Sequence, residues 1–459
     1  MKYLFINVVA GIGSTGRIAA EKCRELQAQG HECVLAYGRA ENGCEGIRTH
    51  RIGTDRDIKL HGLMTRTLDL NGFCSTKATK EFVQWIREYD PDVIWLHNIH
   101  GYYLNVEVLF DYLKSCGKPI KWTLHDCWSF TGHCAYFSAV GCEQWKTGCR
   151  KCPQLGTYPA CKGISNVARN YARKKAAFTG VPDMQLITPS KWLADLVKQS
   201  YLREYPVEVV YNTIDKAIFK PTPSNFREKY GLTDKTIVLG VANLWEERKG
   251  LKDFYALAKM LDSSYAIVLV GLNEKQIREL TKNIPGLTLK ESGQGVSVCN
   301  PVREPERTLR KIDHILTDTV VPQNVQAVYE VLTGNKGTKA HDMQCSILCI
   351  PRTGSPQELA AVYTAADVFV NLTYEENYPT VNLEARACGT PVITYDTGGC
   401  RETLDGLCAA VVNTDCLRKQ GSTFLEKHLR SCIKRRMSVQ LNLQRCLLDS
   451  PYRSHRYSC

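Results

Sequence analysis

Apolar and polar positions alternate along the first half of the chain in a way that predicts short buried strands separated by helices. The expected strands span 2–10, 32–37, 92–97, 120–125 and 184–188. Residues 15–29 have the apolar spacing of a helix, which Gly30 ends. Strands that alternate with helices are typical of an α/β domain with a parallel sheet, and we expect this domain over residues 1–206.

The same rhythm begins again after a connecting segment, the expected linker 207–221. The second set of expected strands spans 236–241, 265–270, 367–372 and 391–395, with helices over 250–261 and 381–388. The pattern therefore predicts two doubly wound domains, the second over residues 222–416. Two segments depart from it, because 288–346 interrupts the alternation as an atypical insertion and 417–459 is a tail rich in Arg, Ser and Cys.

Charge adds to this picture through its distribution. The chain of 459 residues has a net charge of +12, but residues 417–459 hold ten basic and two acidic side chains, which leaves +4 for the rest. This distribution argues against nucleic acid as a partner. Apolar residues at 424–433 follow helical spacing opposite basic ones, so the tail fits a basic amphipathic helix at an anionic membrane surface.

The expected compartment is the cytoplasm, with peripheral association at the inner face of the membrane. No apolar run is long enough to span a bilayer. Asn7 interrupts the apolar start of the chain, and a Gly-rich turn follows it, so we interpret this start as a strand and not as a signal peptide. Thiols stay reduced in the cytoplasm, and the 21 cysteines are therefore not expected to form a disulfide framework.

A glycine-rich turn follows the first expected strand and opens the first helix. Gly11, Gly13 and Gly16 form G-x-G-x-x-G, which lets a phosphate or sugar approach the helix N-terminus. A dinucleotide site also requires a ribose-binding residue at the end of the second strand. Arg39 follows that strand and suits a 2′-phosphate, so an NADP-dependent oxidoreductase stays an alternative.

Two glutamates stand eight residues apart near the carboxyl end of an expected strand. Glu376 lies in the loop after strand 367–372, and Glu384 lies inside the following helix. Ligands of open α/β sheets bind at this edge, where both carboxylates can accept hydrogen bonds from sugar hydroxyls. Gly398 and Gly399 follow the next strand and predict another turn that a ligand can approach closely.

Cys134, Cys142, Cys149 and Cys152 form the pattern C-x7-C-x6-C-x2-C, with turn residues between them. Four thiols in a reducing compartment, two of them in C-x2-C, suit a structural zinc ion. Disulfides and free thiols remain the other interpretations. Two histidines at the end of the strand 92–97, His97 and His100, are weaker candidates on the acceptor side.

Taken in order, these motifs resemble the GT-B glycosyltransferases. The matching segments are 11–16, 91–97, His125, 189–193, 211–215, 219–221, 248–250, the glutamate pair and 398–399. The chain is most similar to the retaining glycosyltransferase family 4 (glycosyl transferases group 1), in its polysaccharide and colanic-acid-type branch. The resemblance covers 1–287 and 347–404. It implies two Rossmann-like domains that face a cleft. It also implies the transfer of a sugar from a nucleotide-sugar donor to a saccharide acceptor that is linked to a lipid.

The resemblance also implies roles for single residues. Glu384 would bind the nucleotide ribose, Glu376 the donor sugar, and His125 the sugar near its reacting carbon. Lys249 and Arg248 would neutralise the diphosphate, although Asn243 stands where the family usually has an arginine. The implied enzyme is a hexosyltransferase that retains the anomeric configuration, with the leaving-group oxygen helping to accept the proton of the acceptor. No metal or other cofactor is expected in catalysis.

Other interpretations stay open at this point. A catalytically impaired nucleotide-binding or assembly protein of the same fold is one, because of the insertion and the divergent end. Another interpretation is that the sequence after Leu404 is not native to the family. A metal-dependent enzyme with a D-x-D motif is disfavoured, since Asp90-Pro91-Asp92 precedes its strand instead of following it.

Overall fold

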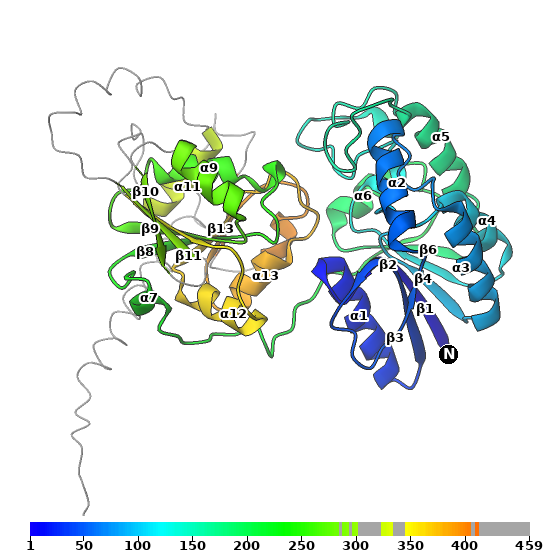
Figure 1. Ribbon diagram of the computed structural model, residues 1–459, viewed down its shortest axis with the longest axis horizontal. Helices are drawn as coiled ribbons and strands as arrows, with labels where there is room; N and C mark the ends of the chain where they lie inside the picture. The colour runs from blue at the N-terminus through cyan, green and yellow to red at the C-terminus, as the bar shows by residue number, and fades with distance from the viewer. Residues whose placement is uncertain (284–286, 293–295, 302–322, 334–344, 405–408, 413–459) are drawn as a thin grey trace, which may run out of the picture. The chain divides into compact units, whose positions relative to one another are not determined.

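The computed structural model describes residues 1–283, 287–292, 296–301, 323–333, 345–404 and 409–412. They form two compact units (Figure 1). Unit 1 consists of Met1–Asn212 together with two short later segments, Glu375–Tyr378 and Thr397–Glu402. Unit 2 contains the described residues within Thr213–Tyr374, Pro379–Asp396 and 403–412. The predicted tail 417–459 lies outside the described residues.

Unit 1 is built on a seven-stranded sheet in the order β3-β2-β1-β4-β5-β6-β7. The strands are β1 (Lys2–Ala10), β2 (Glu32–Glu41), β3 (Arg48–Arg51), β4 (Val93–Leu96), β5 (Ile120–Thr123), β6 (Met184–Thr188) and β7 (Val207–Val209). All neighbouring strands pair in parallel, and Tyr3 of β1, for example, is in register with Cys33 and Val93. Parallel strands are buried on both faces, which explains their nearly continuous apolar sequences.

Helices cover both faces of this sheet. They are α1 (Gly13–Ala28), α2 (Asp55–Leu68), α3 (Thr76–Tyr89), α4 (Val106–Ser115), α5 (Val167–Phe178) and α6 (Lys191–Gln199). Successive residues of β1 point to opposite faces. Leu4 and Ile6 therefore pack in the core under α3, α4, α5 and α6, whereas Phe5 packs in a second core under α1.

Unit 2 has an eight-stranded sheet in the order β10-β11-β12-β9-β8-β13-β14-β15. The strands are β8 (Thr236–Val241), β9 (Tyr265–Val270), β10 (Leu287–Ser292), β11 (Val296–Pro301), β12 (Ser346–Ile350), β13 (Val368–Asn371), β14 (Val392–Tyr395) and β15 (Ala409–Val412). Only the β10–β11 and β11–β12 pairs among these described strands are antiparallel. The parallel part of the sheet holds the predicted strands of the second half.

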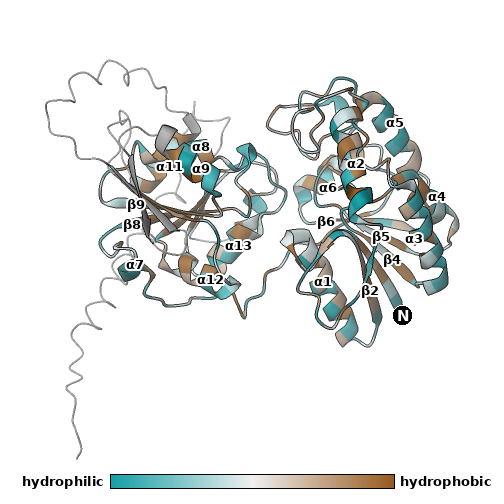
Figure 2. Ribbon diagram, in the orientation of Figure 1, coloured by the Kyte–Doolittle hydropathy of each residue, from teal (hydrophilic) through white to brown (hydrophobic). Residues whose placement is uncertain are grey.

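The helices of unit 2 are α7 (Phe226–Lys229), α8 (Leu251–Ala258), α9 (Glu274–Asn283), α11 (Gln323–Thr333), α12 (Pro356–Ala365) and α13 (Thr380–Ala387). Val238 of β8 packs in a core with α8, α9 and α11, whereas its neighbours Ile237 and Leu239 pack in a core with α12 and α13. Figure 2 shows the same arrangement as hydropathy, with apolar residues concentrated in the strands of each sheet and polar residues on outer helix faces.

Several elements differ from the sequence-based expectations. β2 continues to Glu41, four residues beyond its expected end, so Arg39 lies inside the strand and not after it. β10, β11 and α11 lie in the predicted insertion 288–346, and β15 follows the point at which we expected the alternation to stop. Val207–Val209, placed in the linker from the sequence, is the edge strand β7 of unit 1.

The Asp90-Pro91-Asp92 segment has a structural explanation at the start of β4. Asp90 ends α3 in a left-handed conformation and forms an ion pair with Lys118 at 2.7 Å. Asp92 accepts a hydrogen bond from the backbone N–H of Lys2 at 2.7 Å. Each carboxylate thus has a partner at the amino end of the sheet. Among the described residues, moreover, no helix has the length and apolar character that crossing a membrane requires.

Candidate functional site

The backbone of the glycine-rich turn between β1 and α1 is closely packed. Gly11 and Gly13 have φ values of 69° and 64°, in the left-handed region that favours glycine. A Cβ atom on Gly16 would lie 3.1 Å from Val9 and 3.2 Å from the backbone of Gly11. The residue before α1, Ile12, gives this helix no side-chain cap. The start of α1 therefore has no side-chain cap, and an uncapped helix N-terminus is able to bind an anion.

Two histidines at the carboxyl ends of neighbouring strands contact each other. His97 follows β4 and His125 follows β5, and Nδ1 of His97 lies 3.0 Å from Nε2 of His125. Burial lowers the pKa of His125 to about 4 and that of His97 well below its usual range. Both rings are therefore neutral at pH 7, and one donates a hydrogen bond to the other. His125 is half-buried as a residue, whereas His97 is 3% exposed.

His100 belongs to a separate hydrogen-bonded group beside this pair. Its Nε2 lies 2.9 Å from Oδ2 of Asp126, and its Nδ1 lies 3.0 Å from the hydroxyl of Tyr158. His100 is 6% exposed, whereas Tyr158 is 41% exposed. His100 therefore links the carboxylate of Asp126 to the exposed phenol of Tyr158. Asp126 directly follows His125 in the chain.

Glu376 lies in unit 1, although the sequence places it after a strand of unit 2. Its neighbour Asn377 is buried and donates a hydrogen bond from Nδ2 to the backbone oxygen of His125 at 3.0 Å. The hydroxyl of Ser190 donates to Oδ1 of Asn377 at 2.6 Å. On the other side, Glu375 accepts a hydrogen bond from the backbone N–H of Ala139 at 2.9 Å. The structure therefore brings Glu376 and His125 to one region of unit 1.

Gly398 and Gly399 pack directly against this segment. Gly398 has a φ of 54°, and a Cβ atom there would lie 1.8 Å from the backbone oxygen of Glu376. A Cβ atom on Gly399 would lie 2.1 Å from the backbone oxygen of Asn377. Any side chain at either position would displace the backbone that carries Glu376. The glycines are thus explained by a close approach of two chain segments.

Arg248 and Lys249 lie in unit 2, in a single turn of 3-10 helix over Glu247–Lys249. The backbone oxygen of Arg248 accepts hydrogen bonds from the Tyr374 N–H at 2.8 Å and the Thr373 hydroxyl at 3.2 Å. These contacts attach the turn to the chain that follows β13. Nε of Arg248 lies 2.9 Å from the Glu246 carboxylate. Both cationic side chains are half-buried.

Glu384 lies in α13 of unit 2 and is 5% exposed. The hydroxyl of Tyr363 donates a hydrogen bond to Oε2 of Glu384 at 3.1 Å. Nearby, Asn382 accepts from Asn371 at 2.9 Å and donates to Thr403 at 2.8 Å, so α13 is anchored to the end of β13. The predicted site residues are therefore divided: Glu376, His125 and the glycines belong to unit 1, and Glu384, Arg248 and Lys249 to unit 2.

The four cysteines of the predicted zinc site line one small cavity in unit 1. Cys134 is 5% exposed, and Cys142, Cys149 and Cys152 are half-buried around the same cavity. In the parts of the chain that the structure describes, no three His, Cys, Asp or Glu side chains are arranged to hold a metal ion as they stand. The four-cysteine zinc site therefore stays a prediction.

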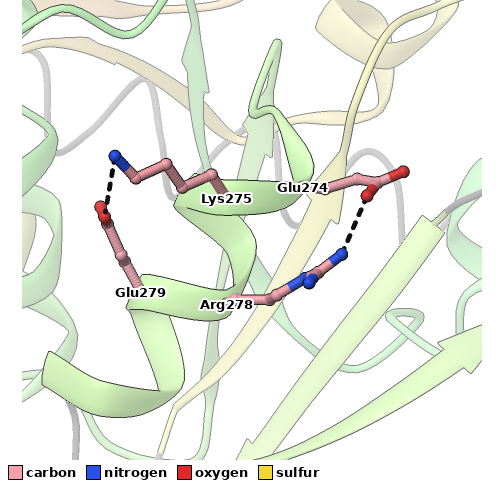
Figure 3. A pocket seen from close by; sticks show the side chains of 4 residues that line it. All are labelled: Glu274, Lys275, Arg278 and Glu279. Carbon is pink, nitrogen blue, oxygen red and sulfur yellow. Dashed lines mark hydrogen bonds and ion pairs between the residues drawn. The ribbon is translucent and has the colours of Figure 1, made fainter.

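A different hollow lies on the surface of α9, lined by four charged residues (Figure 3). Arg278 pairs with Glu274 at 3.0 Å and Lys275 with Glu279 at 3.8 Å. Each cation thus lies beside an acidic side chain one helical turn away, and these side chains are largely exposed. Exposed pairs at this spacing are a common feature of solvated helices. We assign no function to this hollow.

Some residues of this region were not predicted. Neither Asn377 nor Ser190 was an expected site residue, yet Asn377 joins the segment of Glu376 to His125 and Ser190 holds Asn377 in place. Glu402 accepts hydrogen bonds from the backbone N–H groups of Lys191 and Trp192 at 2.7 and 2.8 Å. The available signal was position, since Asn377 directly follows Glu376 and Glu402 directly follows the Gly398 turn. Their partners lie about two hundred residues earlier, which a local pattern does not reveal.

Comparisons with known proteins agree on one family. Residues 15–217 match the family model described as Glycosyltransferase Family 4, and residues 339–413 match the model described as Glycosyl transferases group 1. Together the two matches cover more than half of the chain.

Individual glycosyltransferases also match parts of the chain. WcaC of Escherichia coli K12, named for colanic acid biosynthesis, is 32% identical over 219 residues, which cover 44% of this chain and 52% of WcaC. An N,N'-diacetylbacillosaminyl-diphospho-undecaprenol alpha-1,3-N-acetylgalactosaminyltransferase of Campylobacter jejuni is 34% identical over 77 residues, 16% of this chain and 20% of that enzyme. The chain therefore spans about half of the first relative's length and less of the second.

Among solved structures, Anabaena Alr3699/HepE in complex with UDP-glucose aligns with a TM-score of 0.53 at 14% identity, over 98% of this chain and all of HepE. At this identity the likeness concerns the fold, which is the two-sheet GT-B architecture.

Proposed function

We propose that this chain, which belongs to the glycosyltransferases of family 4 and group 1, transfers a sugar from a nucleotide-sugar donor to a saccharide acceptor in cell-surface polysaccharide biosynthesis. One observation carries the proposal. Asn377 connects Glu376 to the backbone of His125, so a carboxylate and a neutral imidazole from distant parts of the sequence occupy one region of unit 1. A sugar with several hydroxyl groups needs such a set of acceptors and donors.

In this proposal Glu376 accepts hydrogen bonds from hydroxyls of the donor sugar, and His125 contacts the sugar near its reacting carbon. Support for His125 comes from its low pKa, because a neutral ring can donate or accept without adding charge to the site. His97 fixes the orientation of that ring through the 3.0 Å contact. Gly398 and Gly399 allow the backbone of Glu376 to stay where it is.

The nucleotide part of the donor is assigned to unit 2 and to the first glycine turn. Glu384, oriented by Tyr363, would accept hydrogen bonds from the ribose hydroxyls. Lys249 and Arg248 would neutralise the negative charge that develops on the departing diphosphate. The N-terminus of α1, with Gly13 and Gly16, provides backbone N–H groups for the donor on the side of unit 1.

We further propose a hexosyl transfer that retains the configuration at the anomeric carbon and needs no metal ion. Positive charge for the leaving group would come from Lys249 and Arg248. The acceptor hydroxyl would attack from the face that the diphosphate leaves, and a diphosphate oxygen would help to accept its proton. The C–O bond to the diphosphate breaks as the bond to the acceptor forms.

A lipid-linked acceptor is a finer part of the proposal. It is supported by the Campylobacter relative, whose name specifies a diphospho-undecaprenol-linked acceptor. An enzyme with such an acceptor would work at the inner face of the cytoplasmic membrane. We expect a higher rate of sugar transfer when the acceptor is a diphospho-undecaprenol-linked sugar in vesicles than when it is the same saccharide free in solution. Equal rates with the two acceptors would contradict a lipid-linked acceptor.

The general proposal is tested by a thermal-shift screen of UDP-, GDP- and ADP-sugars, followed by a transfer assay with the donor that binds. Transfer is expected to continue in EDTA. A donor that stabilises the protein but is neither transferred nor hydrolysed would indicate a nucleotide-binding protein without catalysis. Stabilisation by NADP and by no nucleotide sugar would contradict the assignment altogether.

The contribution of Glu376 is tested with Glu376→Ala. We expect loss of transfer with an unchanged melting temperature, because the side chain is half-buried and its backbone is held by its neighbours. Glu81→Ala is the matched control, since Glu81 of α3 is 66% exposed in the same unit. Near-normal turnover by Glu376→Ala with the correct donor would rule out its role in donor binding.

A further inference from the structure

The proposed transfer reaction makes no use of the cysteine cavity of unit 1. The cavity has a volume of about 10 Å³ and is lined by Cys134, Cys142, Cys149, Cys152 and His133. A volume of about 10 Å³ holds roughly one water-sized sphere. Its walls include the buried ring of Trp145, which is 1% exposed. A site of this size and composition suits one small ion.

His133 provides independent evidence for a ligand. Its side chain is completely buried, and its Nδ1 lies 2.5 Å from Oδ1 of Asp69. A carboxylate only accepts hydrogen bonds, so Nδ1 carries the proton and Nε2 presents a lone pair. In the described structure Nε2 is buried without a hydrogen-bond partner. A buried polar atom without a partner is costly, and this one belongs to a residue that lines the cavity.

Three of the thiols are also held near one another. Cys134 belongs to the core of unit 1, and Cys149 and Cys152 pack against that core beside the same cavity. A Cβ atom on Gly132 would lie 2.8 Å from Cβ of Cys149, so the backbone beside His133 lies directly against this cysteine.

We propose that this cavity is a structural zinc site whose ligands are the thiolates of Cys134, Cys149 and Cys152 and Nε2 of His133. Three sulfurs and one imidazole nitrogen form a common closed tetrahedral set for structural zinc. The Asp69–His133 pair has the carboxylate–histidine arrangement that orients a metal-bound ring. This ligand set revises the four-cysteine prediction by replacing Cys142 with His133, because Nε2 of His133 is a buried atom without a hydrogen-bond partner.

Binding replaces existing interactions in a balanced way. The three thiols release their protons to solvent as three sulfur–zinc bonds form. Zinc binding would bring these donors together, because in the part of the chain that the structure describes they do not already form a metal-binding group. Three thiolates around Zn²⁺ have a net charge of −1, and the buried Lys174 interacts electrostatically with Cys149 and Cys134.

The site would order the segment that follows His125. Ala139 lies between two of the cysteines, and its N–H donates to Glu375, the residue before Glu376. A zinc ion would therefore support the loop that holds the proposed donor-binding segment. The zinc proposal does not depend on the proposed function, because its tests measure metal content and thiol reactivity instead of transfer.

The first test uses the full wild-type chain, purified without chelators. We expect about one zinc ion per chain, as a closed structural site retains its metal. Removal of zinc with a strong chelator should expose about three additional reactive thiols. A zinc content below about one-tenth per chain would overturn the proposal.

The ligand set is tested with variants and with cobalt. Cys149→Ser, Cys152→Ser and His133→Gln should each lower the zinc affinity about 10-fold or more. Cys116→Ser should have no effect, because that thiol bonds to the Leu113 oxygen outside the cavity, and Cys142→Ser should retain zinc.

Retention of zinc by His133→Gln together with its loss in Cys142→Ser would exclude His133 and restore the four-cysteine set. The absorption of wild-type protein loaded with Co²⁺ distinguishes three sulfurs and one nitrogen from four sulfurs, so the ligand set remains testable where a variant fails to fold.

Discussion

At the scale of single residues, the two glutamates of the E-x7-E motif have different surroundings. Glu384 is 5% exposed and is oriented by Tyr363, whereas Glu376 is half-buried in a segment that Asn377 fastens to His125. The spacing of these carboxylates, and the two glycines after β14, could be read from local sequence. The contacts of Asn377 and His133 could not, because their partners lie far away in the chain and neither residue belongs to a periodic pattern.

Lys249 gives the most direct prediction at this scale. Lys249→Ala should lower kcat about 10²- to 10³-fold, because a fixed positive charge beside the leaving diphosphate stabilises the transition state. Initial rates at saturating donor measure the effect. Lys252→Ala is the matched control, since Lys252 is 79% exposed in the same unit and pairs with Glu247. A loss of less than about threefold, or an equal loss in the control, would contradict the role of Lys249.

At the scale of elements, the apolar pattern predicted the parallel strands well, because a strand buried on both faces has a strong local signal. It missed the end of β2, where Gly38 continues the strand: a Cβ atom there would lie 2.2 Å from Tyr103, so the glycine serves packing rather than a turn. It also missed β15, a four-residue edge strand whose place depends on pairing with β14. Short edge strands depend on their neighbours more than on their own sequence.

α2 gives a prediction about pH. His61 in α2 is 1% exposed, and its Nε2 accepts a hydrogen bond from the N–H of Gly72 at 3.1 Å. Burial lowers the pKa of His61 to about 4. The unfolded chain therefore binds the proton more readily, and the stabilisation by neutral His61 is complete above pH 6.5 and is lost as the pH falls towards 4.

We expect the contribution of His61 to the free energy of unfolding to fall by about 2 kcal/mol between pH 7.5 and pH 5. Urea unfolding at the two pH values measures this change, and His61→Gln should reduce the difference between them. Half-buried His31, which lies outside α2, provides the control as His31→Gln. If the free energy of unfolding changed by the same amount between the two pH values in wild type and in His61→Gln, the assignment of this change to His61 would be wrong.

At the scale of the whole molecule, the sequence predicted two doubly wound units but not how the chain divides between them. Unit 1 ends at Asn212 and then includes Glu375–Tyr378 and Thr397–Glu402. These segments follow β13 and β14, so by sequence alone they belong to the second sheet. Their membership in unit 1 depends on hydrogen bonds between residues separated by 187 to 252 positions, which no local pattern indicates.

Glu402 tests this division. Its carboxylate accepts two N–H groups in the first turn of α6, where a negative charge also interacts favourably with the helix dipole. Glu402→Ala should destabilise unit 1 by about 1–2 kcal/mol. Six of the seven tryptophans lie between residues 85 and 192, so melting followed by tryptophan fluorescence reports mainly on unit 1. An unchanged melting curve, matching that of Glu81→Ala, would contradict the capping role.

The same division sets an order of events during synthesis. A ribosome releases the chain from its N-terminus, so the seven strands of unit 1 emerge long before the segments at 375–378 and 397–402 that complete it. Closing these long loops has an entropic cost that rises only slowly with loop length. The loops cannot close, however, until the ribosome has synthesised the later residues. The first unit of the chain is therefore among the last parts to be finished. A nascent chain arrested after residue 212 should expose the Ser190 end of α6 to proteases and chaperones.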